Sequence, residues 1–336
     1  MNQRQNRTLG EFATVVPGIA GLLATLPVWI FASFLMLSGA AQGQTNPGQT
    51  NPGQTSPGQT KPGQTNTLAN FVPEERLEKL DITKFTRPTA ITNKWLPMKP
   101  GTRYIYDGTT VEDDGKVVPH RIIITITDLV KFIAGVKTLV SYDLDYAKGV
   151  LEEAELAFYA QDDDGNVWRF GEYPEEYDGK KFVKAPAWLA GIQNARAGIM
   201  MKADPKLGTP SYSQGYGPEV NWTDRGQVHQ MGQEVLVGGT RHSDVLAIKE
   251  TSNLEEAVGA AQLKYYAAGI GNIKVGWIGA ADKTKETLEL TKMEQLDAQE
   301  MTAVREKAFA LEKNAYRRSK NVYARTPPAT VESAAK

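Results

Sequence analysis

Three aspartates, a glycine and an asparagine lie together between aromatic residues in the stretch AQDDDGNVWRFGE. Asp162, Asp164 and Asn166 have the 1-3-5 spacing with which an EF-hand loop begins to bind calcium. The remaining EF-hand pattern is absent, because Gly165 stands at position 4 rather than 6 and Tyr173 occupies position 12, where a glutamate is needed. The sequence therefore leaves open a shorter calcium-binding turn, with Asp162, Asp164 and Asn166 as the metal ligands.

The same stretch also fits a β-hairpin that needs no metal. A turn at the Asp-Gly pair places Tyr159 opposite Phe170, whereas a turn at the following Gly-Asn pair places Asp162 opposite Arg169. Calcium is the one cofactor that the sequence suggests, since a cation would relieve the repulsion between adjacent carboxylates. The plain turn and the weak calcium site both remain open at this stage.

The catalytic signatures that can be read from a sequence alone are missing. The chain has no cysteine, and it contains no Gly-x-Ser-x-Gly, phosphate-binding or His-Glu-x-x-His motif. Paired carboxylates are the remaining route to a reaction, as in glycosidases, whose two acids lie about 5–10 Å apart. A secreted hydrolase is therefore the alternative function, with carboxylates in the irregular segment 185–222. Further acidic candidates are Asp143, Asp145, Glu152 and Glu153.

The three histidines do not predict a metal site. A two-residue turn at the Gly-Gly pair 238–239 places His242 opposite Val235 and His229 opposite Ile248. In that register the two histidines lie roughly 20 Å apart along the ladder, at about 3.3 Å per residue. They cannot share a metal ion, and we interpret all three histidines as surface or packed residues.

Aromatic side chains are the stronger hint of a binding surface. Tyr104 with Tyr106, and Trp168 with Phe170, each fall on one face of a strand because side chains alternate with a period of two. Other aromatics gather around segment 185–222. Core packing explains each of them singly, but together they could line a concave sheet that holds a hydrophobic or glycan ligand. The candidate ligand-binding residues are Tyr104, Tyr106, Trp168, Phe170, Trp188, Tyr212 and Trp222.

The N-terminus predicts export. Arg4 and Arg7 precede an apolar run over Ile19–Leu37 that ends in small residues, which is typical of a secretory signal peptide. The run is also long enough to serve as an uncleaved membrane anchor. Residues 1–41 are therefore a signal peptide or an anchor. In either case the rest of the chain lies in the periplasm or at the cell surface, and this segment is its only contact with a membrane.

A spacer follows the leader. Residues 42–67 repeat the pentapeptide GQTNP with small variations and contain almost no apolar side chain, so we expect a disordered linker. The whole chain of 336 residues has a net charge of −1, which gives no reason to expect a nucleic-acid partner. The absence of cysteine also means that the exported domain folds without disulfides.

Residues 77–293 read as a series of short strands with Gly and Asp-Gly turns. This pattern predicts an all-β fold, an antiparallel meander that forms a curved sheet or half-barrel. Residues 294–324 predict an added amphipathic α-helix that either packs on the sheet or mediates self-association, and residues 325–336 predict a disordered tail. The apolar stripe of the helix consists of Met301, Val304, Ala308, Leu311 and Ala315.

Four segments resemble, in the same order, motifs of an uncharacterised family of exported bacterial β-sheet proteins. They are LPMKPGTRYIYDG (Leu96–Gly108), FYAQDDDGNVWRFGE (Phe158–Glu172), AGIMMKADPKLG (Ala197–Gly208) and YYAAGIGNIK (Tyr265–Lys274). The resemblance covers roughly Asp81 to Gly279. It implies a curved antiparallel sheet or half-barrel, as in periplasmic lipid or lipoprotein carriers, and it implies no particular activity. The chain departs from the family pattern at Ala268, where a proline is usual, and at Arg241-His242, where an aromatic usually stands.

Together these observations favour an exported, non-catalytic binding or structural protein of the bacterial envelope. Its expected partner is a small hydrophobic or glycan ligand on the curved sheet, with self-association through the C-terminal helix as a further expectation.

Overall fold

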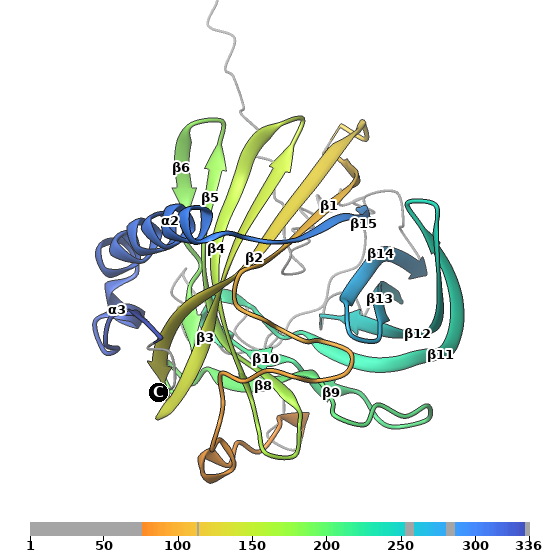
Figure 1. Ribbon diagram of the computed structural model, residues 1–336. Helices are drawn as coiled ribbons and strands as arrows, with labels where there is room; N and C mark the ends of the chain where they lie inside the picture. The colour runs from red at the N-terminus through yellow and green to blue at the C-terminus, as the bar shows by residue number, and fades with distance from the viewer. Residues whose placement is uncertain (1–75, 113, 253–258, 280–285, 333–336) are drawn as a thin grey trace, which may run out of the picture.

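The computed structural model describes residues 76–112, 114–252, 259–279 and 286–332. In these residues sixteen strands form one mostly antiparallel sheet, which is strongly curved but not closed (Figure 1). The predicted all-β class with a single long C-terminal helix is therefore confirmed. The leader (1–41) and the linker (42–67) lie outside the described residues. None of the described helices is long and apolar enough to span a membrane.

The first half of the sheet is a meander of long strands. Alternating β-branched and aromatic residues favour extended backbone, and glycines with positive φ make the turns between strands. The strands are β1 (Thr102–Val111), β2 (Val117–Ile133), β3 (Val136–Ala147), β4 (Val150–Gln161), β5 (Val167–Asp178), β6 (Lys181–Lys184), β7 (Trp188–Leu189) and β8 (Arg196–Met201).

The second half returns to the first. The last long strand, β15, pairs with β1, so the two halves form one continuous ladder. Its strands are β9 (Tyr212–Ser213), β10 (Gly215–Tyr216), β11 (Arg225–Val237), β12 (Thr240–Thr251), β13 (Ala260–Ala267), β14 (Gly271–Gly279) and β15 (Thr287–Gln295). Two short 3₁₀ helices, Ile82–Lys84 and Pro218–Val220, lie in the connections.

The two ends of the ladder belong to one short segment of chain. The strand order begins with β10 and ends with β9, which follow each other in sequence with only Gln214 between them. β10 pairs with β8 and β9 pairs with β11, so residues 212–216 bridge both edges of the sheet. The two halves of the sheet, β1–β8 and β9–β15, therefore face each other across the interior of the molecule.

Alternation along each strand separates an inner face from an outer face. On β3, Leu139, Ser141 and Asp143 point inward, whereas Val140 and Tyr142 belong to the outer core under the helix. The inner core collects apolar residues from both halves of the sheet, and the outer core joins β2–β5 to the C-terminal helices.

Helix α2 (Ala298–Arg318) begins with the predicted capping box, in which Asp297 and Glu300 bond each other's backbone N–H groups. Its whole predicted apolar stripe is buried in the outer core, so the face considered for self-association packs on the protein's own sheet. The shorter α3 (Lys320–Tyr323) follows and buries Tyr323.

Three expectations from sequence are corrected by the described residues. Residues 325–332 belong to the folded structure rather than to a disordered tail, because β16 (Thr330–Val331) pairs with β2, and the rest of the predicted tail (333–336) lies outside the described residues. The acidic hairpin has a five-residue loop, 162–166, which places Arg169 rather than Phe170 opposite Tyr159.

The third correction concerns the histidines. Val235 does pair with His242, as predicted, but Ile248 pairs with Val228 instead of His229. Bulges along β11 insert extra residues between these two points and shift the register.

Candidate functional site

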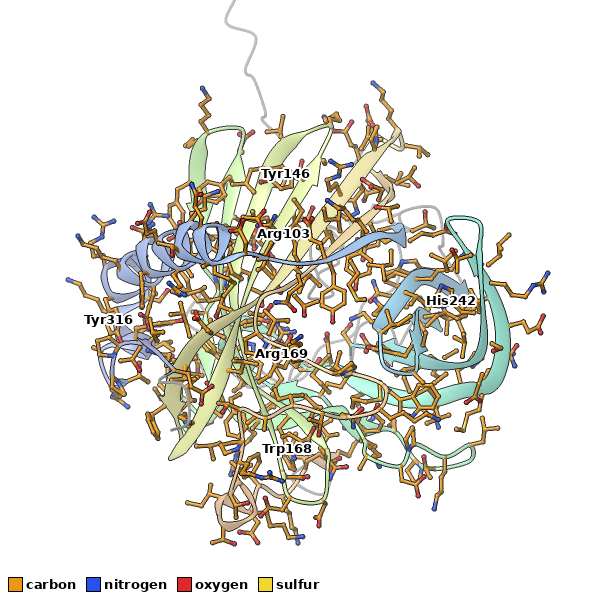
Figure 2. The ribbon with its side chains drawn as sticks, in the orientation of Figure 1. Arg103, Tyr146, Trp168, Arg169, His242 and Tyr316 are labelled. Atoms are coloured by element: carbon orange, nitrogen blue, oxygen red, sulfur yellow. The ribbon has the colours of Figure 1, made fainter. Side chains whose placement is uncertain are left out.

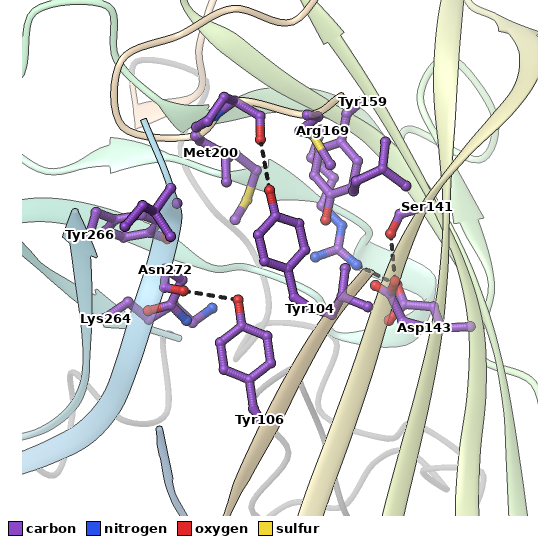
Figure 3. Close-up of a pocket in the computed structure, with 18 residues that line it drawn as sticks. Tyr104, Tyr106, Ser141, Asp143, Tyr159, Arg169, Met200, Lys264, Tyr266 and Asn272 are labelled. Carbon is purple, nitrogen blue, oxygen red and sulfur yellow. Dashed lines mark hydrogen bonds and ion pairs between the residues drawn. The ribbon is translucent and has the colours of Figure 1, made fainter. Parts of the chain in front are cut away.

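The interior contains a cavity of about 90 Å³ between the two halves of the sheet (Figure 3). Four tyrosines line it, two from β1 and one each from β4 and β13, together with methionines and isoleucines. The tyrosines are Tyr104, Tyr106, Tyr159 and Tyr266. This combination of aromatic walls in a concave site is typical of small-ligand pockets.

Tyr104 and Tyr106 reach the cavity because they are two residues apart on β1 and share its inner face (Figure 3). The Tyr106 hydroxyl crosses the cavity and donates a hydrogen bond to the Asn272 carbonyl at 2.9 Å. Tyr104 Oη lies 3.5 Å from the Pro97 carbonyl. Tyr106 therefore connects the two halves of the sheet through the cavity.

The polar side of the cavity comes from the middle strands. Asp143 on β3 pairs directly with Glu155 on β4, so both carboxylates enter the cavity from adjacent strands. Arg169 on β5 lies beside them near the centre of the molecule (Figure 2). Its Nη2 is 2.5 Å from Glu155 Oε1 and also contacts the buried Glu172.

Asp143 has a strongly perturbed acidity. Burial and the neighbouring charge of Glu155 raise the pKa of Asp143 to about 8, while a hydrogen bond from Ser141 at 2.5 Å acts in the opposite direction. Burial also raises the pKa of Glu172 well above its ordinary value. The raised pKa values of Asp143 and Glu172 favour their neutral forms, so this site holds fewer negative charges than its composition suggests.

A second polar cluster continues along the inner face from the cavity. His120 Nε2 lies 2.7 Å from Asp145 Oδ1, and its Nδ1 lies 3.3 Å from Glu286 Oε2. Burial alone would lower the pKa of His120, but the Asp145 hydrogen bond and the two carboxylate charges outweigh it and raise that pKa to about 9. His120 is therefore a buried cation that pairs with Asp145 and Glu286, and these two ion pairs compensate for its burial on the inner face.

The sequence-predicted ligand residues fall into separate places. Tyr104 and Tyr106 line the cavity, as described above. Trp168 and Phe170 face outward into the outer core, where both rings pack edge-to-face on Phe85.

The remaining predicted aromatics lie at the bridging segment. Trp188 and Trp222 stack at 5.0 Å between ring centroids, and the Trp222 ring also contacts the Arg169 guanidinium at 5.2 Å. Tyr212 is fully buried, with Lys202 Nζ 4.8 Å from its ring centre. None of these three side chains lines the cavity, and of the three only Trp222 has a described contact with a cavity residue, Arg169.

The predicted hydrolase acids are also separated. Asp143 lines the cavity, whereas Asp145 pairs with His120. Glu153 is the cross-strand partner of Asp145, and burial raises its pKa well above the ordinary value. Burial and the charge of Asp145 raise the pKa of the half-buried Glu152 to about 7.

Sequence reasoning missed several cavity residues, among them Arg169 and Lys264. From the sequence, Arg169 is assigned only a place opposite Asp162 in one of the two possible hairpin registers. A signal for it existed in the alternation on β5, which places Val167 and Arg169 on the face opposite to Trp168 and Phe170. Lys264 shares its face of β13 with Tyr266, but β13 pairs only with its sequence neighbours β12 and β14, so the sequence did not indicate that this face meets β1–β5 across the cavity.

The three proposed calcium ligands each have other partners in the hairpin loop. Asp162 accepts hydrogen bonds from the Asn166 backbone at 2.8 Å and from Trp168 Nε1 at 2.7 Å. The Asp164 carboxylate lies 2.7 Å from Lys84 Nζ. Among the residues that the structure describes, no group of three or more His, Cys, Asp or Glu side chains is arranged to hold a metal.

Calcium binding at this loop stays a prediction, with a specific requirement. Calcium must displace Lys84 from Asp164, so we expect only a modest rise in melting temperature, and the change Asp164→Asn should abolish it. Thermal melts in excess calcium and in chelator check this. Identical melts of the unaltered protein in the two solutions would exclude the site.

Comparisons with known proteins give a distant likeness only. No protein-family model matches the chain, and no curated protein matches it. A crystal structure of a predicted exported protein with a YmcC-like fold from Bacteroides fragilis is 11% identical, with a TM-score of 0.33, and covers 60% of this chain and 99% of that one. A predicted lipoprotein from Parabacteroides distasonis is 8% identical, with a TM-score of 0.31 and the same coverage. At such low TM-scores, neither structure informs the function of this chain.

Proposed function

We propose that the protein is an exported, non-catalytic binding protein that holds one small ligand with an apolar or sugar body in the tyrosine-lined cavity. The observation that carries this proposal is the cavity itself, since its walls are mainly tyrosine, methionine and isoleucine side chains, with a few polar groups contributed by both halves of the sheet. Ligand sites typically combine an apolar lining with a few convergent polar groups. The basic residues and the apolar run of the leader in the sequence support export.

The geometry of the polar side favours binding over reaction. Glu155 is held by Arg169 at 2.5 Å, which stabilises its negative charge and weakens it as a nucleophile or base. Nonetheless, one observation supports the hydrolase alternative. Asp143 and Glu155 are adjacent carboxylates, and Asp143 carries the raised pKa that a general acid needs.

Native mass spectrometry tests the proposal. The full chain, exported by a bacterial host, is expected to carry a small-molecule adduct that is released on unfolding. A matched variant, Ile124→Trp, fills the cavity from β2 and should lose the adduct while keeping its fold by circular dichroism. An adduct of equal occupancy in both proteins, or none in either, would contradict binding in this cavity.

The same protein samples distinguish a hydrolase from a binding protein. A hydrolase should release product from a panel of aryl glycosides and esters, and Asp143→Asn should abolish that release. Turnover by the unaltered protein that depends on Asp143 would replace the binding proposal with the enzymatic one.

A further inference from the structure

Of the two acidic residues that line the cavity, Asp143 is the one without a close ion pair in the described residues, although Arg169 lies near enough for its charge to oppose the rise in the pKa of Asp143. Within the part of the chain that the structure describes, no lysine, arginine or histidine forms an ion pair with its carboxylate. Its one side-chain hydrogen bond comes from Ser141. Figure 3 shows Asp143 and Ser141 together at the edge of the cavity, across from Tyr104 and Tyr106. The carboxylate is thus oriented toward the space that a ligand would occupy.

Both cations that line the cavity are engaged by other carboxylates. Arg169 contacts Glu155 and Glu172, and the Lys264 ammonium lies 2.5 Å from Glu250. Around the cavity, four carboxyl groups, from Asp143 and these three glutamates, therefore face two cations, and the raised pKa values of Asp143 and Glu172 favour the neutral forms of these two acids. An anionic ligand would find no free cation among the lining residues, whereas a cationic ligand would favour ionisation of Asp143 and pair with it.

The aromatic walls point to the same ligand chemistry through a different interaction. Ring faces carry negative electrostatic potential and attract ammonium groups, more strongly where water is excluded. The protein already uses such contacts beside the cavity, since the Arg169 guanidinium lies 5.7 Å from the Tyr159 ring centre. Four tyrosines around an unpaired carboxylate resemble, in their chemistry, the aromatic sites that hold ammonium ligands.

We propose that the ligand of this cavity is an amine, whose protonated nitrogen pairs with Asp143 while its apolar part contacts the tyrosines. This inference rests on the proposed binding function and specifies the ligand class. The inference also predicts that binding changes the number of protons bound to the protein, and this change can be measured. The raised pKa of Asp143 favours its protonated form, and pairing with an ammonium group requires the ionised carboxylate. Binding therefore releases a proton, and the affinity rises as the pH increases from about 6 to about 8.

Isothermal titration calorimetry of the full chain with n-butylammonium, n-butanol and n-butyrate tests the proposal, because the three probes share a shape and differ in charge. We expect n-butylammonium to bind at least tenfold more tightly than the other two, and to bind more tightly at pH 8 than at pH 6. Buffers with different ionisation enthalpies should reveal the released proton. The variant Asp143→Asn should lose this preference, whereas the surface variant Asp204→Asn should keep it.

The outcomes separate this inference from the function on which it rests. Equal or tighter binding of butanol or butyrate, or a preference that survives Asp143→Asn, overturns the amine proposal and leaves a binding protein for another ligand. Failure of all three probes overturns the amine proposal as well. If the exported protein then also carries no adduct in native mass spectrometry, the proposed binding function fails with it.

Discussion

Replacing Lys131 with alanine should destabilise the protein by about 3–5 kcal/mol, because it leaves a buried carboxylate without its cation. Lys131 lies on β2 with a side chain that is 0% exposed, and its Nζ is 2.9 Å from Glu312 Oε1 on α2. The same nitrogen donates to the Tyr316 hydroxyl at 3.0 Å and to the Pro327 carbonyl at 2.6 Å. This one ammonium group therefore attaches the helix and the C-terminal segment to the sheet.

Urea unfolding followed by tyrosine and tryptophan fluorescence measures the effect. The control is Lys206→Ala, which breaks an exposed pair with Asp204 and should leave the unfolding midpoint unchanged. The double change Lys131→Met with Glu312→Leu should recover much of the loss, since a well-packed apolar pair can replace a buried ion pair. A midpoint for Lys131→Ala equal to that of the control would contradict the described role of Lys131.

Replacing Arg169 with methionine should have an effect of similar size, about 3–5 kcal/mol at neutral pH, for the same physical reason. Arg169 contacts two buried carboxylates, Glu155 and Glu172, so its removal leaves both without their cation. Arg241→Met is the matched control, because Arg241 pairs with Glu234 on an exposed part of β11 and β12. Guanidinium unfolding of the two variants checks the difference.

The destabilisation caused by Arg169→Met should increase as the pH rises. Burial and the charge of Glu155 raise the folded-state pKa of Asp143 to about 8, and burial raises the pKa of Glu172 well above its ordinary value. An acid with a raised folded pKa contributes stability below its unfolded value of about 4, and this contribution is lost as the pH rises through the folded pKa. Without Arg169 the ionised forms of Asp143 and Glu172 are still less favourable. The difference in the free energy of unfolding between the Arg169→Met variant and the unaltered protein should therefore widen from pH 5 to pH 8. A gap that stays constant over this range would contradict the role assigned to the carboxylate cluster.

The fold was largely predictable because its signals are local. Alternation along RYIYDGTTV predicted a strand and placed Tyr104 and Tyr106 on one face, and that face is the one that lines the cavity. The capping box at Asp297 and the helical stripe likewise depend on residues within a few positions of each other. Periods of 2 and 3.6 can be read from a single sequence.

The site was less predictable because it depends on long-range contacts. Lys264 and Asp143 meet in one cavity only because β15 returns to pair with β1. The hairpin register was missed because the Asp162 side chain accepts hydrogen bonds from Asn166 and Trp168, and this favours a five-residue loop over a two-residue turn. The order in segment 325–332 depends on Lys131, which lies about 200 residues earlier in the chain.

A crystal structure of the full chain, purified from the envelope of its bacterial host without added ligand, tests the central claim most directly. The account predicts electron density for one small molecule in the cavity, with its apolar part against Tyr104 and Tyr106 and a polar atom within hydrogen-bond distance of Asp143. A cavity that holds only water, or a ligand bound elsewhere with this cavity collapsed, would contradict it.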